Sequence, residues 1–402
     1  MPLPGGHAAG PTRRVLGLAL ALALVGCRGN CPPRARPLGR PPRLGHRVLV
    51  LAPHPDDEVL GATGLLAGTL RRGGRAQVIV ATDGAADGRG ERAVRLAATR
   101  ESETRRALGR LGLGAGDVTF LGYADGGLAA AWSERWQVAR RDVGDVSATR
   151  LVDALHAALR TFEPDTVVLP MPLDRHPDHA ALGRLTMLAM LEEPGQPGLL
   201  AYLVHGGPGW PAHRRSAGCG TIPRPGGCSA SLAWADLRLD PPTIALKASL
   251  IEEYRSQLAR GAVLRPFAAE NEPFTGGVLV HANRAMSRWR PGVHRASGGV
   301  AIDVPRSACG ADVAGGGRLR LRYVEAEEIQ ERLVMLGAVP QVLGGAPGGA
   351  LVAADDVRVA LAPRAVRLRL NGRAVADVRG VVLDAISPGG MRAAAPAWLL
   401  RW

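Results

Sequence analysis

Four residues within a string of five, early in the chain, have the types that bind metal ions and move protons. The string His54-Pro55-Asp56-Asp57-Glu58 follows directly after the apolar run 47–51. Such a run is typical of a buried strand, and open α/β sheets place their ligand sites at the carboxyl ends of strands. Neighbouring residues on an extended segment point in opposite directions. One of the two aspartates is therefore free to bind a metal while the other holds a proton.

A second string of this kind, His176-Pro177-Asp178-His179, follows the apolar segment 166–170. We expect the two strings to meet at one edge of the same sheet. A catalytic zinc ion takes three ligands of the His and carboxylate kind and leaves a position open for water. His54, Asp57 and His179 would supply these three ligands, which predicts a mononuclear metal hydrolase.

Two further side chains of these strings are left over for proton transfer. Asp56 would act as general base toward the water, and His176 as a donor to the developing oxyanion or the leaving group. The alternative is structural, because Asp and Glu in the first turn of a helix cap free amides and complement the helix dipole. The presence of the second string at another strand end favours the metal site.

The two strings resemble the hallmark HPDD and HxDH motifs of the PIG-L and LmbE family of zinc-dependent N-acetylglucosaminyl deacetylases. The resemblance continues through the segments 58–62, 82–84, 100–103 and 120–126 and a late helix at 247–257, and so covers residues 46 to 275. It implies a Zn²⁺ cofactor and an N-acetylated glycan or glycoconjugate as substrate. The same ligand set would also accept Fe²⁺ or Co²⁺.

Carried over by position, the resemblance implies that His54, Asp57 and His179 bind zinc, that Asp56 is the base and that His176 stabilises the tetrahedral intermediate. The reaction would be hydrolysis of an acetamide, with release of acetate and an amino sugar.

Three more residues enter through the resemblance alone. Asp178 is implied as a partner that fixes a histidine ring, and Arg100 and Asp125 match positions that contact the sugar. For Arg100 a solvated helix face is the alternative, and for Asp125 a simple turn. Residues 173–175 include no aromatic group where relatives acting on small glycosides can carry one, so the substrate pocket is expected to differ.

Two other functions stay open at this point. One is a surface lipoprotein that binds glycans on the same fold and has lost its chemistry. The other is a deacylase that removes a longer acyl chain from an amide. Retention of both Asp56 and His176, which binding alone would not require, favours the enzyme.

The N-terminus has the features of a bacterial lipoprotein. Arg13-Arg14 precede the apolar run 15–25, which is shorter than the roughly 20 residues that span a membrane, and Cys27 ends a string that resembles a lipobox. We predict a signal peptide over 1–27, lipidation of Cys27, and anchoring at the cell envelope on the periplasmic or outer-membrane face. A plain secretory signal is the alternative. Sec and twin-arginine export are not distinguished.

Composition supports an exported globular protein. The net charge of +14 comes almost wholly from arginine, since Lys247 is the only lysine, and no basic stripe with interleaved aromatic residues indicates a nucleic-acid partner. Cys219 and Cys228 flank a turn-rich loop that a disulfide would close in an oxidising compartment. A structural zinc site is the alternative, although the chain has no CxxC pair.

Hydrophobic periodicity predicts the elements that hold the two strings. Strands at about 47–52, 76–82, 117–121, 166–170 and 200–205 alternate with helices at about 58–72, 91–112, 148–161 and 178–191. This alternation predicts an α/β, Rossmann-like fold with a mainly parallel sheet and helices on both faces.

The rest of the chain divides at two places. Residues 28–45 are a Pro/Arg-rich linker before a deacetylase domain over 46–280, and 281–402 are predicted as a β-rich C-terminal module. Runs such as 318–323, 357–361 and 365–370 alternate apolar and charged residues, and Asn371-Gly372 is a hairpin turn signal. The module would either bind glycan or cover the catalytic domain.

Overall fold

The computed structural model describes residues 44–402, apart from residues 87, 194, 212–219, 224, 288–289, 297, 309–310, 313–316, 372–376 and 387–396. The predicted signal peptide, Cys27 and nearly all of the 28–45 linker lie outside the described residues, as does Cys219. The side chain of Cys228 is not described either, so the disulfide stays a prediction.

A nine-stranded sheet forms the centre of the first half, in the order β5-β4-β3-β2-β1-β6-β7-β9-β8. Five neighbouring strands, β3-β2-β1-β6-β7, run parallel to one another. The strands that flank them, β4 and β5 on one side and β9 and β8 on the other, pair antiparallel. The bounds are β1 Arg47–Ala52, β2 Arg75–Thr82, β3 Val118–Tyr123, β4 Gln137–Arg140, β5 Gly144–Ser147, β6 Thr166–Pro170, β7 Gly198–Tyr202, β8 Trp234–Arg238 and β9 Asn271–Thr275.

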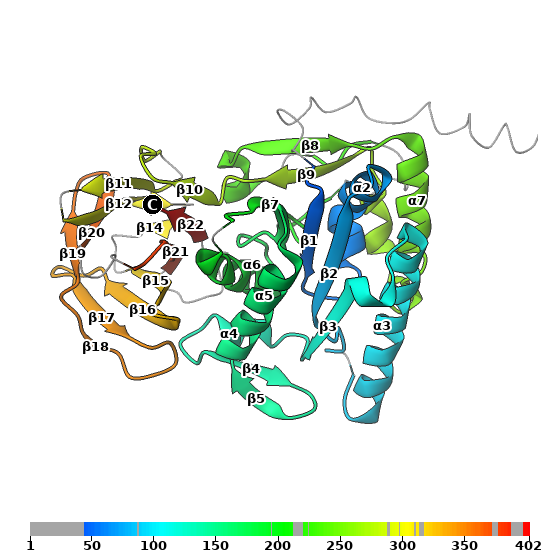
Figure 1. The fold of residues 1–402 in the computed structure, drawn as a ribbon, viewed down its shortest axis with the longest axis horizontal. Helices are drawn as coiled ribbons and strands as arrows, with labels where there is room; N and C mark the ends of the chain where they lie inside the picture. Colours follow the sequence, from blue (N-terminus) through cyan, green and yellow to red (C-terminus); the bar gives the residue numbers. More distant parts are fainter. Residues whose placement is uncertain are drawn as a thin grey trace, which may run out of the picture.

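Helices cover both faces of this sheet (Figure 1). Helices α2, α3 and α7 pack on one face, and α5 and α6 pack on the other. The bounds are α2 Asp57–Arg71, α3 Glu91–Leu111, α4 Leu128–Ala131, α5 Thr149–Phe162, α6 Pro177–Ala189, α7 Pro241–Ile251 and α8 Arg255–Leu258, with 3-10 turns η1 Ala115–Asp117, η2 Met190–Glu192, η3 Gly227–Ser231 and η4 Ala262–Phe267. The predicted α/β class is confirmed.

One predicted helix was placed too late in the chain. The segment expected at 247–257 is two helices, and α7 begins at Pro241 because the Asp240 side chain accepts a hydrogen bond from the amide of Thr243 at 2.9 Å. Proline at the first helical position and an Asp cap are ordinary start signals. The chain leaves helical geometry after Ile251 and resumes it at Arg255.

The chain reverses direction across the sheet at β1, which pairs with β2 on one side and with β6 on the other. Such a reversal opens a crevice at the carboxyl ends of the two strands. The first histidine string follows β1 and the second follows β6. The strand order therefore brings the two strings together.

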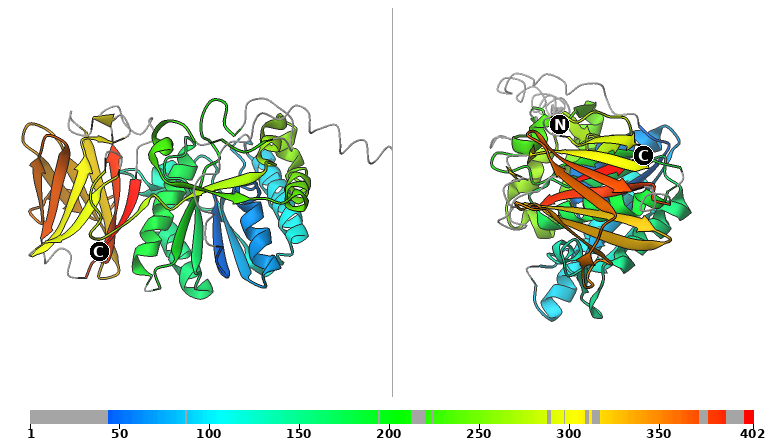
Figure 2. Two further views of the ribbon diagram at one scale, coloured as in Figure 1. Left: turned by 90° about the horizontal axis from the view of Figure 1, so that it is seen from above. Right: turned by 90° about the vertical axis from the view of Figure 1, so that its left-hand side faces the viewer.

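The C-terminal residues form two further sheets (Figure 2). One has seven strands in the order β10-β22-β21-β15-β16-β17-β18, and the other has four in the order β11-β12-β20-β19. Apolar side chains of both sheets belong to one hydrophobic cluster. The bounds are β10 Leu279–His281, β11 Gly292–Ala296, β12 Gly299–Pro305, β15 Arg318–Glu325, β16 Glu328–Met335, β17 Gln341–Gly345, β18 Val352–Ala353, β19 Val357–Leu361, β20 Ala365–Asn371, β21 Gly380–Ile386 and β22 Ala397–Arg401, with a two-residue pair β13 Ser307–Ala308 and β14 Ala311–Asp312.

The alternating pattern of 365–370 is that of a strand with one buried face, as predicted. The hairpin expected at Asn371-Gly372 is not found in the described residues. β20 pairs with β12 and β19, whereas the next strand, β21, lies in the seven-stranded sheet. The chain therefore passes from the four-stranded sheet to the seven-stranded sheet where a hairpin was expected. Which strand pairs next depends on contacts between distant segments, and a local turn motif does not predict them.

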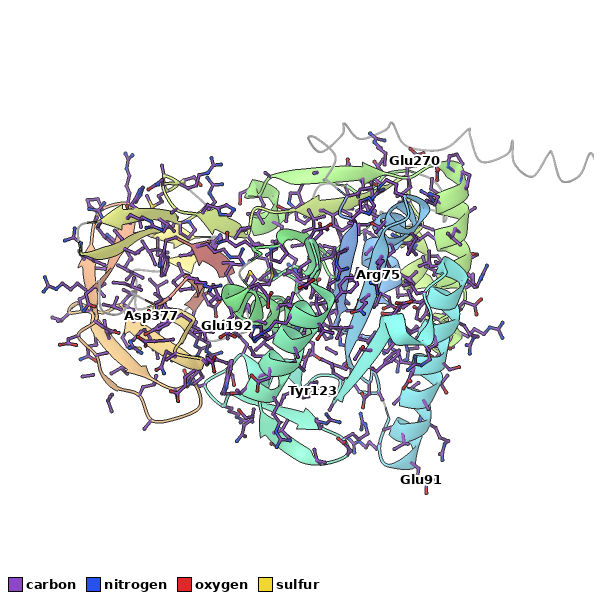
Figure 3. All side chains as sticks on the ribbon, viewed as in Figure 1. Arg75, Glu91, Tyr123, Glu192, Glu270 and Asp377 are labelled. Carbon is purple, nitrogen blue, oxygen red and sulfur yellow. The ribbon has the colours of Figure 1, made fainter. Side chains whose placement is uncertain are left out.

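The C-terminal sheets share a hydrophobic cluster with the first half through α6 and η2. A polar cleft of about 970 Å³ opens at this junction, between α5 and η2 on one side and the β15–β16 hairpin on the other. Glu192 and Asp377, labelled in Figure 3, both line it. Because its α/β part is built from the segments that precede β6 and β7, the cleft lies at the end of the strands opposite to the histidine strings.

Helix α2 is held close to its neighbours by two glycines and a buried ion pair. A Cβ at Gly61 would lie 2.3 Å from the Tyr202 ring, so no larger residue fits there without a shift. The fully buried Lys247 donates to Glu272 and to the carbonyl oxygen of Leu60, both at 2.7 Å. Glu272 in turn accepts from the amide of Gly64 at 2.8 Å. In the described part of the chain, no helix is both long and apolar enough to cross a bilayer.

Candidate metal centre

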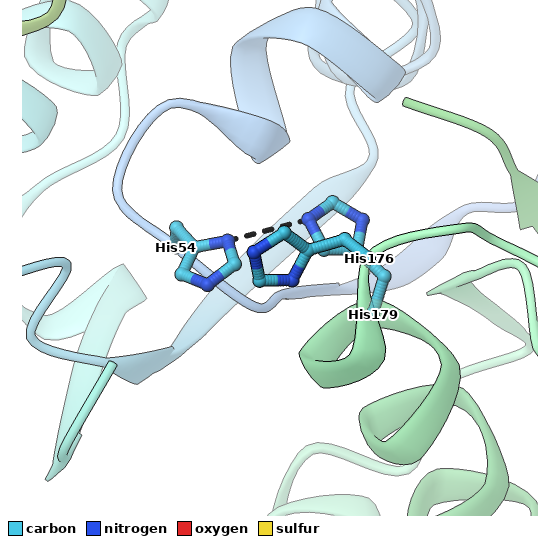
Figure 4. Close-up of side chains that lie close together, drawn as sticks. All are labelled: His54, His176 and His179. Atoms are coloured by element: carbon cyan, nitrogen blue, oxygen red, sulfur yellow. Dashed lines mark hydrogen bonds between the residues drawn. The ribbon is translucent and has the colours of Figure 1, made fainter. Parts of the chain in front are cut away.

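The two strings meet in a buried cluster of histidines and aspartates, and Figure 4 shows its three histidines, His54, His176 and His179. His54 Nδ1 lies 3.2 Å from Asp57 Oδ2, and His179 Nε2 lies 3.1 Å from the same oxygen. The two nitrogens are 3.3 Å apart. His54, Asp57 and His179 thus present one atom each to a common point, and their side chains are almost fully buried.

These spacings fit a tetrahedral ion. Zinc bonds of about 2.0–2.2 Å to nitrogen and oxygen place neighbouring ligand atoms about 3.3–3.5 Å apart. The observed separations of 3.1–3.3 Å are within a few tenths of an ångström of this range. One nitrogen from each of His54, His176 and His179 also forms a group within 4.8 Å.

The far nitrogen of each ligand ring faces a carboxylate. His54 Nε2 lies 3.1 Å from Asp125 Oδ1 and 3.4 Å from Asp178 Oδ2. His179 Nδ1 lies 3.3 Å from Asp174 Oδ2. A carboxylate behind a metal-binding histidine holds the proton on the far nitrogen and leaves the near nitrogen free to bind the ion. The carboxylates at the far nitrogens therefore favour, for both rings, the tautomer whose near nitrogen can bind an ion.

Asp174 connects the second string to the strand next to it. Its Oδ1 accepts from the amide of His176 at 2.8 Å, and its Oδ2 accepts from the amides of Val204 and His205, each at 3.0 Å. The side chain is buried and also lies 3.3 Å from His205 Nδ1. A single carboxylate thus orients His179 and fixes the backbone around it.

Asp56 has a backbone conformation that residues with a side chain rarely adopt, with φ 128° and ψ −29°. Such strain persists only where surrounding contacts impose it, and it concentrates at functional sites. Arg100 donates to Asp56 Oδ2 at 3.0 Å and to the carbonyl oxygens of Pro55 and Gly84 at 2.6 Å. The amide of Asp56 donates to Glu58, which accepts from the hydroxyl of Tyr254 on the other side.

The surroundings of Asp56 shift its acidity. Burial raises the pKa of Asp56, the Arg100 guanidinium opposes this, and the carboxylates of Asp57 and Glu58 add to the rise, so that the pKa lies at about 7. A carboxyl group at such a pKa can both take up and release a proton near neutral pH.

His176 lies beside the ligand rings and caps α6. Its Nδ1 accepts from the amide of Asp178 at 3.3 Å, which leaves the proton of the neutral ring on Nε2. Burial lowers the pKa of His176, and the neighbouring imidazoles of His54 and His179 lower it further, to about 4. His176 is therefore a neutral hydrogen-bond donor at pH 7. Its ring centroid lies 4.6 Å from that of His54 and 5.0 Å from that of His205.

Negative charge is in excess throughout the cluster. Five aspartates at positions 56, 57, 125, 174 and 178 lie around the histidines, and the Arg100 guanidinium pairs with two of them, Asp56 at 3.0 Å and Asp125 at 4.0 Å. Charges in a buried site need a partner. A divalent cation among the ligand atoms would supply the missing positive charge, so the residues present fit such an ion.

The sequence prediction placed Arg100 and Asp125 at the substrate. In the structure both are mostly buried, and the contacts described above are with other parts of the protein: Arg100 with Asp56, and Asp125 with His54. The solvated face considered for Arg100 is wrong, because the side chain is 4 % exposed. A contact of either residue with substrate stays a prediction.

Asp174, Glu58 and Tyr254 escaped the sequence prediction of the site. A signal for Asp174 existed, since it stands two residues before His176 after the same strand. Glu58 was part of the first string but was assigned no role. Tyr254 comes from a segment far away in sequence and carries no local signal. Asp178, expected to fix a histidine ring, lies near His54 and also accepts from the amides of Gly126 and Leu128 at 2.8 and 3.0 Å.

The fold and this site define a class of α/β protein with a buried histidine and aspartate cluster at a switch point between parallel strands. Residues 49–190 match the family model PIG-L, described as GlcNAc-PI de-N-acetylase. This part of the chain is a PIG-L family domain. No curated protein matches the chain.

Several solved structures are similar to part of the chain. The conserved protein TT1542 from Thermus thermophilus is 24% identical, with a TM-score of 0.39 over 57% of this chain and 93% of that one. N,N'-diacetylchitobiose deacetylase from Pyrococcus horikoshii is 18% identical, with a TM-score of 0.41 over 66% and 93%. The A40926 pseudoaglycone deacetylase Dbv21 is 21% identical, with a TM-score of 0.40 over 57% and 96%.

Proposed function

We propose that this protein is a metal-dependent hydrolase that removes the acetyl group from an N-acetylated sugar of the GlcNAc type, with zinc as its ion. The observation that carries the proposal is the triangle of ligand atoms from His54, Asp57 and His179, with edges of 3.1–3.3 Å. The PIG-L domain over residues 49–190 supports the deacetylase chemistry.

The ion, when bound, would supply Lewis acidity that activates water and polarises the amide carbonyl. Asp56 stands next to the ligand Asp57 in sequence, and its carboxylate is fixed by Arg100 at 3.0 Å. It would take the proton from the attacking water and keep it close to the reacting carbon. Since Arg100 also binds the carbonyls of Pro55 and Gly84, it holds the whole turn that carries Asp56.

His176 would serve the other side of the reaction. Its Nδ1 accepts a hydrogen bond from the amide of Asp178, so the proton of the neutral ring is on Nε2, which can donate a hydrogen bond to the substrate. A neutral donor of this kind stabilises the negative oxygen that develops when water adds to an amide carbonyl. The proton held by Asp56 would then pass to the departing nitrogen, so that acetate and an amine leave.

The test is metal content and acetate release, measured on the parent protein beside His179→Ala. We expect about one zinc per chain in the parent and a marked loss in the variant. Acetate release should be assayed over a panel of N-acetylglucosaminides, with longer N-acyl analogues in parallel.

The outcomes separate the candidate functions. Zinc with acetate release supports the proposal, and zinc with release of longer acids only would reassign the acyl group. A chain that binds glycans and takes up neither zinc, Fe²⁺ nor Co²⁺ would overturn the hydrolase and leave the glycan-binding lipoprotein.

We also propose that the protein is exported and held at the cell envelope by a lipid on Cys27, with the 28–45 segment as tether. The support is the sequence pattern alone: an apolar run over 15–25 and the cysteine after Gly26. Metabolic labelling with a palmitate analogue should mark the parent and not Cys27→Ala. Equal labelling of both would contradict the anchor.

A further inference from the structure

The segment behind His54 continues directly into the junction with the C-terminal sheets. Asp125 faces the His54 ring, and the amides of Gly126 and Leu128 are held by Asp178. Helix α4 then spans only Leu128–Ala131, a length of about 6 Å at 1.5 Å per residue. The next residue, Trp132, is fully buried in the hydrophobic cluster that both halves share.

The C-terminal sheets bind this segment through buried polar groups. Asp384 of β21 accepts from Trp132 Nε1 at 3.0 Å. Arg320 and Arg322 of β15 donate to the carbonyl oxygens of Trp132 and Ser133 at 2.9 and 2.8 Å. None of these side chains is more than 2 % exposed. Each hydrogen bond therefore forms in a dry region where leaving a group unpaired is costly.

Aromatic rings add to this contact. The Arg322 guanidinium lies 4.5 Å from the ring centroid of Trp132 and 4.3 Å from that of Trp136. Glu331 of β16 binds the same guanidinium at 2.5–2.6 Å from the other side. The cation is thus fixed by an ion pair and two ring faces. The residues after α4 have little freedom to move relative to β15 and β16.

The second oxygen of Asp384 reaches the helix that carries the other half of the site. Asp384 Oδ1 lies 3.3 Å from Arg184 Nε, and Arg184 is a residue of α6. The same helix begins at Pro177 and holds Asp178 and His179 in its first turn. One carboxylate of the C-terminal sheets thus contacts both segments that orient the ligand histidines, the α4 segment and α6.

We propose that Asp384 is a positioning residue for the metal centre: it joins the α4 segment to α6 and thereby holds Asp125 and Asp178 against His54. The C-terminal sheets are then part of the machinery that shapes the site, and the PIG-L domain over 49–190 depends on them for its geometry. The functional half of this proposal rests on the proposed metal site. The structural half, the order of residues 125–131, can be measured without a metal.

The experiment compares Asp384→Asn and Trp132→Phe with the parent, each as the full chain. The second variant removes the Nε1 donor together with part of the buried indole, and it keeps an aromatic ring against Arg322. Asp303→Asn is the matched control, because Asp303 lies in the same C-terminal sheets and pairs with the exposed Arg367 at 2.7 Å. Hydrogen exchange of the peptide spanning 125–131 is followed in the metal-free proteins, with amides of β2 as the internal reference for global unfolding.

We expect the 125–131 amides to exchange about ten times faster in both variants than in the parent, relative to β2, because the local opening loses a tertiary restraint. Zinc affinity, measured by chelator competition, should fall by about 3–10 fold, less than the 10–100 fold typical of a direct partner of a ligand. The visible spectrum of the Co²⁺ form should change, since it reports ligand geometry. Asp303→Asn should show none of these effects.

The opposite results are equally informative. A lower melting temperature with unchanged exchange at 125–131 and unchanged zinc affinity would overturn the proposal and make the C-terminal sheets a passive cover. Faster exchange in a protein that binds no metal would support the structural half, the ordering of residues 125–131 by Asp384, and would contradict both the functional half and the proposed function. If Asp384→Asn does not fold, Trp132→Phe alone decides between these outcomes.

Discussion

Two networks of buried charge share helix α6, and they are balanced in opposite ways. Around the histidines, five aspartates face the single guanidinium of Arg100. At the junction with the C-terminal sheets, the guanidiniums of Arg184, Arg320 and Arg322 face two buried carboxylates, those of Glu331 and Asp384, and Arg320 also lies 3.9 Å from the exposed Glu134. Among the buried groups described here, the first network has more carboxylates than guanidiniums, and the second has more guanidiniums than carboxylates.

The difference teaches what each network is for. At the junction, the surplus positive charge lies against the faces of Trp132 and Trp136, so the protein itself completes the balance. In the histidine cluster, burial opposes protonation of the rings, but the surrounding carboxylates outweigh this effect and raise the pKa values of His54 and His179, so that without an ion these imidazoles hold protons where a cation would bind. The cluster also presents three ligand atoms to one point. We infer that one network is built for rigidity and the other for a cation from outside. The predictions below test this contrast.

The largest effect is expected for Asp56, and it tests whether this carboxylate serves proton transfer while its neighbour Asp57 serves metal binding. Asp56→Asn keeps the shape of the side chain and its contact with Arg100 but removes the base. Deacetylase activity should fall by about 10²–10⁴ fold, the usual range for loss of a general base. Zinc content should stay at the parent level, and a loss of zinc would show that Asp56 belongs to the ligand set.

The next effect concerns stability. Glu331→Gln leaves the buried cations Arg320 and Arg322 without their carboxylate, which should lower the free energy of unfolding by about 3–5 kcal/mol. Urea unfolding followed by tryptophan fluorescence measures this. Glu328→Gln, an exposed residue on the same strand, is the matched control. Equal effects of the two variants would contradict a junction built on buried charge.

A smaller effect is expected at the carboxylate behind His179. Asp174→Asn keeps one oxygen as acceptor for the amides of Val204 and His205, but it places an NH2 group where Oδ1 accepts from the amide of His176 and removes the negative charge beside the far nitrogen of the ring. Zinc affinity should fall by about 10–100 fold, as for other partners of metal-binding histidines. The measurement is competition with a chelator of known affinity. An unchanged affinity would mean that the helix alone sets the ring orientation.

The smallest effect is predicted for an ion pair outside both networks. Arg367 Nε lies 2.7 Å from Asp303 Oδ1, and the Arg367 side chain is 59% exposed. Exposed pairs contribute about 0–1 kcal/mol, so Arg367→Ala should change the free energy of unfolding by no more than that. A larger loss in urea unfolding would mean that the four-stranded sheet depends on this pair.

Much of the first half was predictable because its signals are local. The apolar runs at 47–51 and 166–170 are buried strands, and the strings after them lie at the carboxyl ends where parallel strands place ligands. His54, Asp57 and His179 were therefore brought together by reasoning from two short motifs. Their role as ligands stays a prediction until a metal is measured.

The parts that escaped prediction depend on contacts between distant segments. Tyr254 reaches Glu58, and Asp384 reaches Trp132, across gaps that no periodicity describes. The β21 strand joins the other sheet because its fully buried pattern suits the middle of a sheet. The hairpin signal at Asn371-Gly372 reports only the local turn and carries no information about which sheet comes next.

The ion pair between Lys247 and Glu272 has a consequence for the chemical reactivity of the chain. Because Lys247 is the only lysine and its side chain is fully enclosed beneath α2, the folded protein exposes no side-chain amine. Amine-directed acylating reagents should therefore leave Lys247 unmodified in the native state and mark it only once α2 separates from α7. This single amine is thus an intrinsic chemical probe of unfolding. Its modification can be measured by mass spectrometry as the mass increase of the peptide that contains Lys247.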